Sequence, residues 1–270
     1  MKKSLGPYKP DSTFISWWKL VLLTSILIQS FLSTLMLVFF QDISNKSSNE
    51  LVLIDLAADV VYMLSILFHF RTAYYYHGEL RTSSYDIFLN YLTGSFIIDT
   101  ISMLSLIGRF SELSQLNYLL LLTLLRIYQI PSLIASIEDY FQFNRQVKSM
   151  IEVVKLCFVI FILAHWLGCI LYAITKIEDY EDTWLVGISG LEENNITDFY
   201  VVSLYWAIMT MSTVGYGDIT PKSTKERILT IAIMILSSVV FGFLLSSIGS
   251  LLMEISAYSS EARYFHFSFK

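Results

Sequence analysis

Six long apolar stretches, separated by shorter polar segments, dominate the pattern of the chain. They lie near residues 14–40, 51–71, 88–107, 116–137, 151–174 and 226–253. A bilayer core is crossed by about 20 mostly apolar residues in a helix, so the pattern predicts six membrane-spanning helices. The first stretch is too long for a secretory signal and lacks a small-residue cleavage site, so we expect it to remain as a span.

A seventh apolar stretch, residues 199–212, is shorter than a span and lies between the fifth and sixth stretches. It is followed directly by the glycine-containing run 213–218. A short helix at membrane depth is tolerated only where protein or water surrounds it. We therefore expect an all-α membrane protein with six transmembrane helices and one re-entrant helix.

Composition agrees with a membrane protein, because 55% of the residues are hydrophobic and only 15% are charged. The net charge of -5 gives no basic footprint and argues against nucleic acid as a partner. Cys157 and Cys169 both lie inside an apolar stretch, so they form neither a disulfide framework nor a metal set. Membrane lipid is the partner that this composition predicts.

Lysine and arginine are distributed unevenly between the two sides of the predicted spans. One side holds Lys2, Lys3, Lys9, Lys19, Arg71, Arg81, Arg145, Lys148, Lys155, Arg263 and Lys270. The other side holds Lys46, Arg109, Lys176, Lys222, Lys225 and Arg227. Because cytoplasmic loops are enriched in these residues, we expect a multi-pass plasma membrane protein with both termini cytoplasmic.

The loop from Lys176 to Asp198 carries an excess of acidic residues on the predicted outer side. Its acids are Glu178, Asp179, Glu181, Asp182, Glu192, Glu193 and Asp198. Such a loop either raises the local cation concentration by its field or is simply a solvated acidic surface. The sequence leaves both interpretations open.

The run 213–218 carries the chemistry, and it matches the TVGYG loop of potassium-channel filters. A potassium ion that enters a membrane must exchange its water shell for oxygen dipoles that are already in place. The matching residues are the potassium ligands Thr213, Val214, Gly215 and Tyr216, with Gly217 and Asp218 after them. Glycine is expected at positions 215 and 217 because the backbone conformations there exclude a Cβ. One loop cannot surround an ion, so a homotetramer is predicted.

Other motifs resemble the cyclic-nucleotide-gated and hyperpolarisation-activated group of six-helix cation channels. The carrying residues are Asp59-Val60-Val61-Tyr62, Phe70-Arg71-Thr72, His165-Trp166-Leu167-Gly168-Cys169 and Ile248-Gly249-Ser250. The filter is similar to that of potassium-selective members, including microbial ones. The resemblance implies a cytoplasmic N-terminus (1–13), a voltage-sensor-like bundle (14–137), a linker (138–150), a pore domain (151–254) and the start of a cytoplasmic linker (255–270).

The resemblance also implies a nucleotide-binding region after the sixth helix, and none is expected within these 270 residues. A cyclic nucleotide would therefore act only through a region outside this sequence. Steep voltage gating is also not expected, because only Arg126 is charged among Leu120, Thr123, Arg126, Gln129 and Ser132, at every third position. Each charge crossing the field contributes about 2.3 kcal/mol per 100 mV, so four such subunits supply roughly 9 kcal/mol.

Three acids lie inside the predicted second and third spans: Asp55, Asp59 and Asp99. Intramembrane carboxylates are costly unless they are paired, and Arg126 is the expected partner. Pro131 is expected to interrupt the helix soon after Arg126. The cluster is interpreted either as a weak sensor or as a charge network that holds four helices together.

Two further sets of residues are candidates for support and gating. Tyr205 and Trp206, with Asp218, resemble the hydrogen-bonded cuff behind other potassium filters, the alternative being interfacial aromatics. Phe241, Leu245, Ile248 and Leu252 recur on one face of the sixth helix, as a dewetting gate or as ordinary packing.

The function predicted from the sequence is passive potassium conduction, with little dependence on voltage. The chain shows neither the convergent reactive cluster of an enzyme nor the repeated broken helices of a secondary transporter. Alternatives that remain are a voltage-modulated potassium channel without ligand gating and a non-conducting subunit of a mixed tetramer.

Overall fold

The computed structural model describes residues 7–40, 46–111, 114–176, 183–185 and 196–268. The chain divides into two compact units, Met1–Gln142 and Phe143–Lys270. Apart from Asp198, the acids of the predicted negative loop lie outside the described residues, so the proposed role of that loop stays a prediction.

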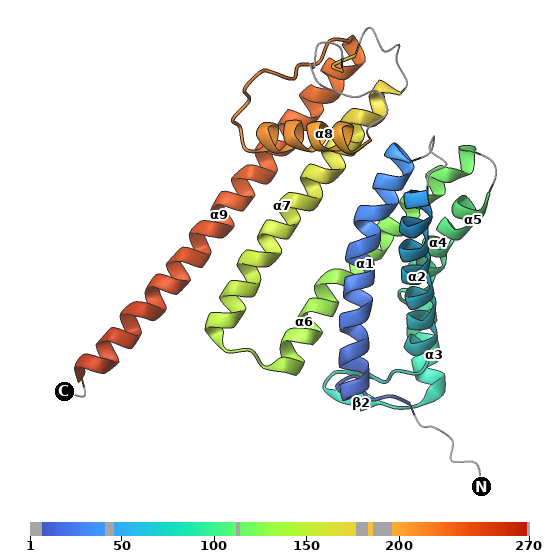
Figure 1. Cartoon of the computed structure of the whole chain (residues 1–270). Coiled ribbons are helices and arrows are strands. Elements are labelled where there is room, and N and C mark those ends of the chain that lie inside the picture. Colours follow the sequence, from blue (N-terminus) through green and yellow to red (C-terminus); the bar gives the residue numbers. More distant parts are fainter. Residues whose placement is uncertain (1–6, 41–45, 112–113, 177–182, 186–195, 269–270) are drawn as a thin grey trace. The chain divides into compact units, whose positions relative to one another are not determined.

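The first unit is a bundle of helices, which Figure 1 shows in blue to green. Its elements are α1 (Thr13–Phe39), α2 (Lys46–His69), α3 (Ser84–Thr93), α4 (Phe96–Met103), α5 (Ser105–Phe110), η1 (Ser114–Gln129) and α6 (Ile130–Phe141). A core of Leu22, Ile26, Tyr62 and Leu133 joins α1, α2 and α6. The bundle thus has its own hydrophobic core.

The third predicted span is bent where α3 ends. The segments Ser84–Thr93 and Phe96–Phe110 meet at 63°. Gly94 lies at the bend, and a Cβ there would come within 2.9 Å of the Asn90 carbonyl oxygen. The helix can turn at this position because glycine leaves that space free.

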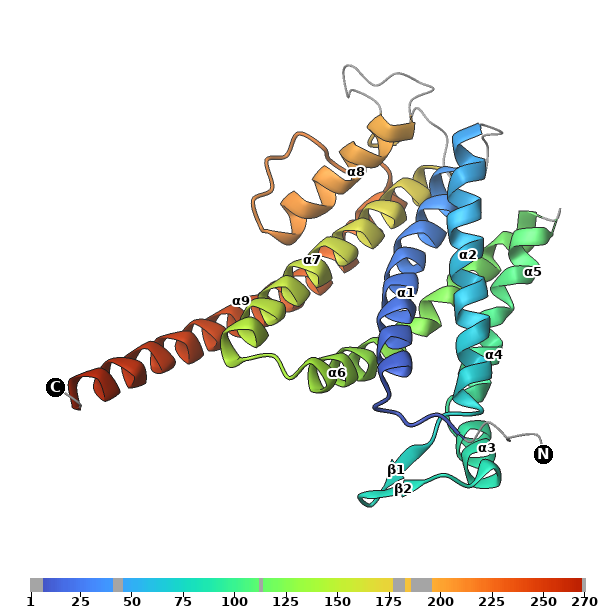
Figure 2. The same cartoon turned by 60° about the horizontal axis from the view of Figure 1, so that its bottom comes forward.

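A short antiparallel hairpin, β1 (Tyr74–Tyr76) and β2 (Glu79–Arg81), follows α2 and was not predicted from the sequence (Figure 2). Its turn residues His77 and Gly78 have φ angles of 49° and 82°, as a two-residue turn with two left-handed positions requires. The N-terminal segment is joined to the hairpin because the Tyr75 hydroxyl donates to Asp11 over 2.6 Å. That hydrogen bond raises the pKa of Tyr75.

The element η1 is a 3₁₀ helix of 16 residues, longer than such helices usually are. Side chains three residues apart align in this geometry. The aligned residues Leu120, Thr123, Arg126 and Gln129 are all buried. The every-third spacing noted in the sequence is therefore one continuous buried face.

Pro131, which the sequence predicted to interrupt the helix, lies where the helix type changes, and the fourth span continues past it. It lies in the first turn of α6, where a missing backbone N–H costs no helical hydrogen bond. The span runs from Leu116 to Phe141 and changes from 3₁₀ to α geometry at Ile130. Helices consequently extend into the predicted linker 138–150 from both sides.

The second unit contains α7 (Arg145–Thr175), α8 (Ile196–Met211) and α9 (Thr224–Ser268). The Asn144 side chain caps α7 by accepting a hydrogen bond from the Val147 backbone N–H over 2.9 Å. In Figures 1 and 2, α8 lies at the end of the unit where α7 stops and α9 begins. The short helix α8 is thus part of the connection between the long helices α7 and α9.

The predicted fold class is confirmed. Among the described residues, five helices are long and apolar enough to cross a membrane, and six if the bent pair counts as one span. The shorter apolar helix Ile196–Met211 lies between the last two spans. The protein is therefore a helical membrane protein in which one short helix precedes the glycine-containing run.

Candidate functional site

The predicted filter segment, residues 213–218, has alternating backbone handedness. Thr213, Gly215 and Gly217 have φ angles of 60°, 55° and 76°, whereas Val214 and Tyr216 between them do not adopt positive φ. Alternation of αL and αR residues directs successive peptide N–H groups to one side, and the sign of φ alternates in this manner from Thr213 to Gly217. The alternating sign of φ agrees with the expected row of carbonyl ligands, which stays a prediction.

The end of α8 holds the start of this segment. The Met209 carbonyl accepts hydrogen bonds from the backbone N–H groups of Val214 over 3.0 Å and Gly215 over 3.2 Å. These contacts help to keep Thr213 in a conformation that costs a non-glycine residue about 1–3 kcal/mol. The position of α8 thereby sets the position of the filter segment.

Within one chain the filter segment remains largely uncovered. The side chains of Val214 and Tyr216 are 51% and 74% exposed. A large apolar and an aromatic side chain at such exposure are suited to further packing, as in an assembly of several chains.

The predicted cuff residues differ in their placement. The Tyr205 hydroxyl donates to the Asp218 carboxylate over 2.8 Å, so α8 and the end of the filter segment are tied together as the sequence suggested. The other carboxylate oxygen of Asp218 accepts the Ile219 backbone N–H. Trp206 is 3% exposed and lies in the packed interior of the unit.

Glu226, which the sequence did not single out, fixes the start of α9. Its backbone N–H donates to the Ser223 hydroxyl, and its carboxylate accepts the Lys222 backbone N–H over 2.8 Å. A Ser-x-x-Glu spacing before an apolar run is the signal that would have found this cap. The same carboxylate accepts the Trp184 backbone N–H over 3.1 Å, which anchors residues 183–185.

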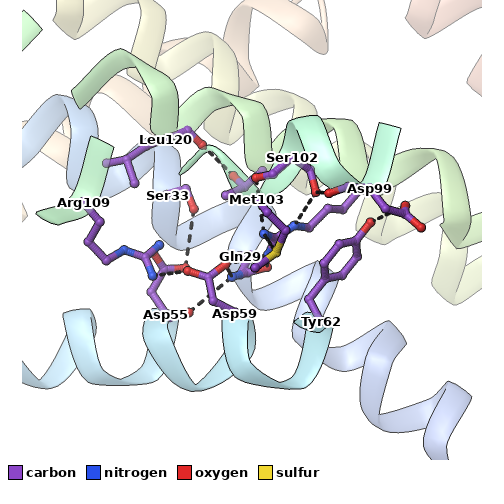
Figure 3. Close-up of polar contacts among 12 residues, drawn as sticks. Gln29, Ser33, Asp55, Asp59, Tyr62, Asp99, Ser102, Met103, Arg109 and Leu120 are labelled. Carbon is purple, nitrogen blue, oxygen red and sulfur yellow. Dashed lines mark hydrogen bonds and ion pairs between the residues drawn. The ribbon is translucent and has the colours of Figure 1, made fainter. Parts of the chain in front are cut away.

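A second polar cluster lies inside the first unit, and Arg109 of α5 is its unpredicted member (Figure 3). The Arg109 guanidinium donates one hydrogen bond to Asp55 and another to Asp59, both on α2. The side chains of Arg109 and Asp55 are 5% and 0% exposed. This buried bidentate contact joins the third span to the second.

Arg126 of η1 is fully buried and binds Asp59 over 2.7 Å. It also donates to the Gln29 side-chain oxygen on α1 and to the Ser102 hydroxyl on α4. Its guanidinium carbon lies 4.0 Å from the centre of the Tyr62 ring, a cation–π geometry. Arg126 thus connects four helices of the bundle.

The expected pairing of Arg126 with the three acids is correct for Asp59, whereas Asp55 is paired with Arg109 and Asp99 is bound by neutral donors. The Asp99 carboxylate accepts hydrogen bonds from neutral donors, at distances between 2.6 and 2.8 Å. These donors are Tyr62, Tyr91, Tyr128 and Gln129. Gln129 follows Arg126 by three residues on the buried face of η1, so Asp99 lies one 3₁₀ turn beyond Arg126.

The predicted gate residues are distributed along α9. Leu245, Ile248 and Leu252 are 54%, 41% and 61% exposed, and Phe241 is half-buried. An exposed apolar face is compatible with a gate formed between several chains and equally with packing between them. Their role stays a prediction.

This combination of apolar spans, a short helix and an alternating backbone segment is typical of channel-type membrane proteins. A family model described as "Ion transport protein" matches residues 15–260, so the chain belongs to this family. Membership identifies a channel and not an enzyme. The family covers both units of the chain.

Among curated proteins, the chain is similar to voltage-gated inwardly rectifying potassium channels. KCNH2 of Sus scrofa is 25% identical over 229 residues, covering 79% of this chain and 19% of that protein. KCNH2 of Rattus norvegicus is 28% identical over 229 residues, and the alignment again covers 79% of this chain and 19% of that protein. KCNH6 of Homo sapiens is 24% identical over 281 residues, covering 95% of this chain and 29% of that protein. The chain spans less than a third of the length of these relatives.

Proposed function

We propose that this protein is a potassium-selective channel formed by four copies of the chain around a central axis. The alternating sign of φ along residues 213–217 carries the proposal, because a potassium filter holds its ion with successive backbone carbonyls on one side. One chain supplies one such row, and four rows are needed to surround a dehydrated ion. The names of the similar potassium channels support the same ion.

The proposed ligands are the backbone carbonyls of Thr213, Val214, Gly215 and Tyr216, with the Thr213 hydroxyl at one end. Tyr205 and Asp218 brace the row from behind through their 2.8 Å hydrogen bond. We place the protein in the plasma membrane with both termini cytoplasmic, as the distribution of lysine and arginine favours.

Purified protein in a planar bilayer under a potassium gradient tests the proposal. We expect the reversal potential to follow the potassium equilibrium potential and to remain there when sodium is added to the dilute side. A reversal potential that follows sodium equally well, or a bilayer that carries no current, would contradict the proposed function.

Opening is proposed to depend only weakly on voltage, because the two buried arginines of the bundle, Arg109 and Arg126, are held in ion pairs. Arg126 is the one arginine of η1 and binds three helices, and Arg109 belongs to α5. By resemblance to the cyclic-nucleotide-gated group, a nucleotide-binding region outside these 270 residues would open a gate at Phe241, Leu245, Ile248 and Leu252. The names of the relatives favour the alternative, a voltage-modulated potassium channel.

A conductance–voltage curve tests the weak voltage dependence, and adding cyclic AMP tests whether a nucleotide site lies within this chain. We expect a shallow curve, equivalent to about one elementary charge per subunit. Cyclic AMP is expected to leave the curve of the 270-residue protein unchanged. A steep curve carrying several charges per subunit would support the voltage-modulated alternative, and a response to cyclic AMP would place a nucleotide site within this chain.

A further inference from the structure

The contact between α7 and α8 is unusually close at Gly168. A Cβ at this position would lie 3.1 Å from the backbone carbon and oxygen of Ser203. Ser203 is completely buried, as are Ala164, one turn before Gly168 on α7, and Ala207, one turn after Ser203 on α8. Small residues let the two backbones approach, so α7 is the surface on which α8 rests.

A buried histidine lies in the same contact. His165 of α7 is 0% exposed, and its Nδ1 atom lies 3.1 Å from the hydroxyl of Tyr200 on α8. One turn further along α7, the Cys169 sulfur lies 3.7 Å from His165 Nε2. The same sulfur lies 3.9 Å from His165 Nδ1, and the donor in the hydrogen bond between Nδ1 and the Tyr200 hydroxyl is set by the imidazole tautomer.

The two ends of α8 make different contacts. Tyr200 lies in its first turns, whereas Met209 near its end accepts the backbone N–H groups of Val214 and Gly215. Nine residue steps separate Tyr200 from Met209, which corresponds to about 13.5 Å in an α-helix. A tilt of about 3° at the Tyr200 end therefore moves Met209 by about 0.7 Å, more than the roughly 0.5 Å that an ion-ligand site tolerates.

We infer that His165 is a positioning residue for the filter, which it controls through its hydrogen bond to Tyr200 and the tilt of α8. The inference rests on the proposed potassium conduction. His165 is not proposed to contact the permeating ion. It holds α8 in position, and α8 binds the start of the filter segment through Met209. A change at His165 is therefore expected to alter potassium selectivity.

The test is the ratio of potassium to sodium permeability, measured from reversal potentials under mixed-ion conditions. Tyr200→Phe removes one hydroxyl and preserves the ring, so the protein should assemble normally. We expect the ratio to fall about fivefold, the factor that loss of one buried hydrogen bond produces. His165→Ala should give the same loss, and His165→Asn, which keeps a polar atom near the Nδ1 position, should restore the ratio to within about twofold of the original protein.

Matched variants separate positioning from a general structural effect. Tyr85→Phe removes a hydroxyl from an exposed tyrosine of the first unit and should leave the ratio unchanged. If His165 acts through Tyr200, the double variant should lose no more than either single one, since residues in one interaction are not additive. Additive losses, or a Tyr200→Phe protein with an unchanged ratio, would overturn the inference. An unmodified protein that does not select potassium would refute the proposed function instead.

Discussion

Replacing Gly215 with alanine is expected to abolish potassium-selective flux. Gly215 has a φ of +55°, and a left-handed conformation costs an L-residue with a Cβ roughly 1–2 kcal/mol. Nothing lies within 4 Å of the position that a Cβ would take, so the penalty is conformational and not a clash within the chain. In a tetramer the four copies together raise this conformational penalty to roughly 4–8 kcal/mol, enough to rotate the peptide out of its filter conformation.

The measurement is potassium and sodium uptake into liposomes that contain the purified variant. Gly78→Ala is the matched control, because Gly78 has a φ of +82° and equally free space but lies in the hairpin of the other unit. It should show similar backbone strain with unchanged selective flux. Selective potassium uptake by Gly215→Ala within about twofold of the original protein would show that this glycine is not required in the filter.

Replacing Arg109 with glutamine is expected to destabilise the protein by about 3–5 kcal/mol, the usual cost of removing one partner from a buried ion pair. The guanidinium is bound by Asp55 and Asp59, and all three side chains are at most 5% exposed. Glutamine keeps hydrogen-bonding capacity but leaves the two carboxylates short of one positive charge. A fall in melting temperature of at least about 6 °C in detergent would follow.

Arg81→Gln provides the control for this experiment. Arg81 also contacts an acid, Glu79, but their side chains are 47% and 76% exposed. Surface pairs contribute little, so the melting temperature should change by less than about 2 °C. Equal stability of the Arg109 and Arg81 variants would mean that the buried contact does not hold the bundle together.

The sequence predicted the features that depend on local pattern. Long apolar runs identified the spans, because a bilayer imposes a minimum helix length. The Tyr205–Asp218 contact followed from a motif whose two residues are only 13 positions apart. The alternating φ angles agree with the expectation for Gly215 and Gly217, whereas the positive φ of Thr213 had no signal in its residue type.

Two contacts set by tertiary packing, those of Arg109 and His165, were not predicted. Arg109 was assigned to the outer side of the membrane, since nothing local indicates that its side chain reaches two acids 50 and 54 residues away. Charge balance would have given a hint, because three intramembrane acids had a single basic partner. The His165–Tyr200 contact lacked even that signal, since a neutral histidine in an apolar helix has many equivalent packing partners.

The 3₁₀ form of η1 has a geometric consequence for this bundle. In an α-helix, residues three apart are rotated by about 300°, so over the nine residues from Leu120 to Gln129 they drift by roughly half a turn. Leu120 and Gln129 would then face opposite directions, so the four residues would no longer form one buried face, although Arg126 and Gln129 would remain neighbours. At about 2.0 Å of rise per residue instead of 1.5 Å, the 16-residue element is also about 8 Å longer than its α-helical equivalent. The type of helix therefore sets how far the segment from Ser114 to Gln129 extends and which of its residues share the buried face.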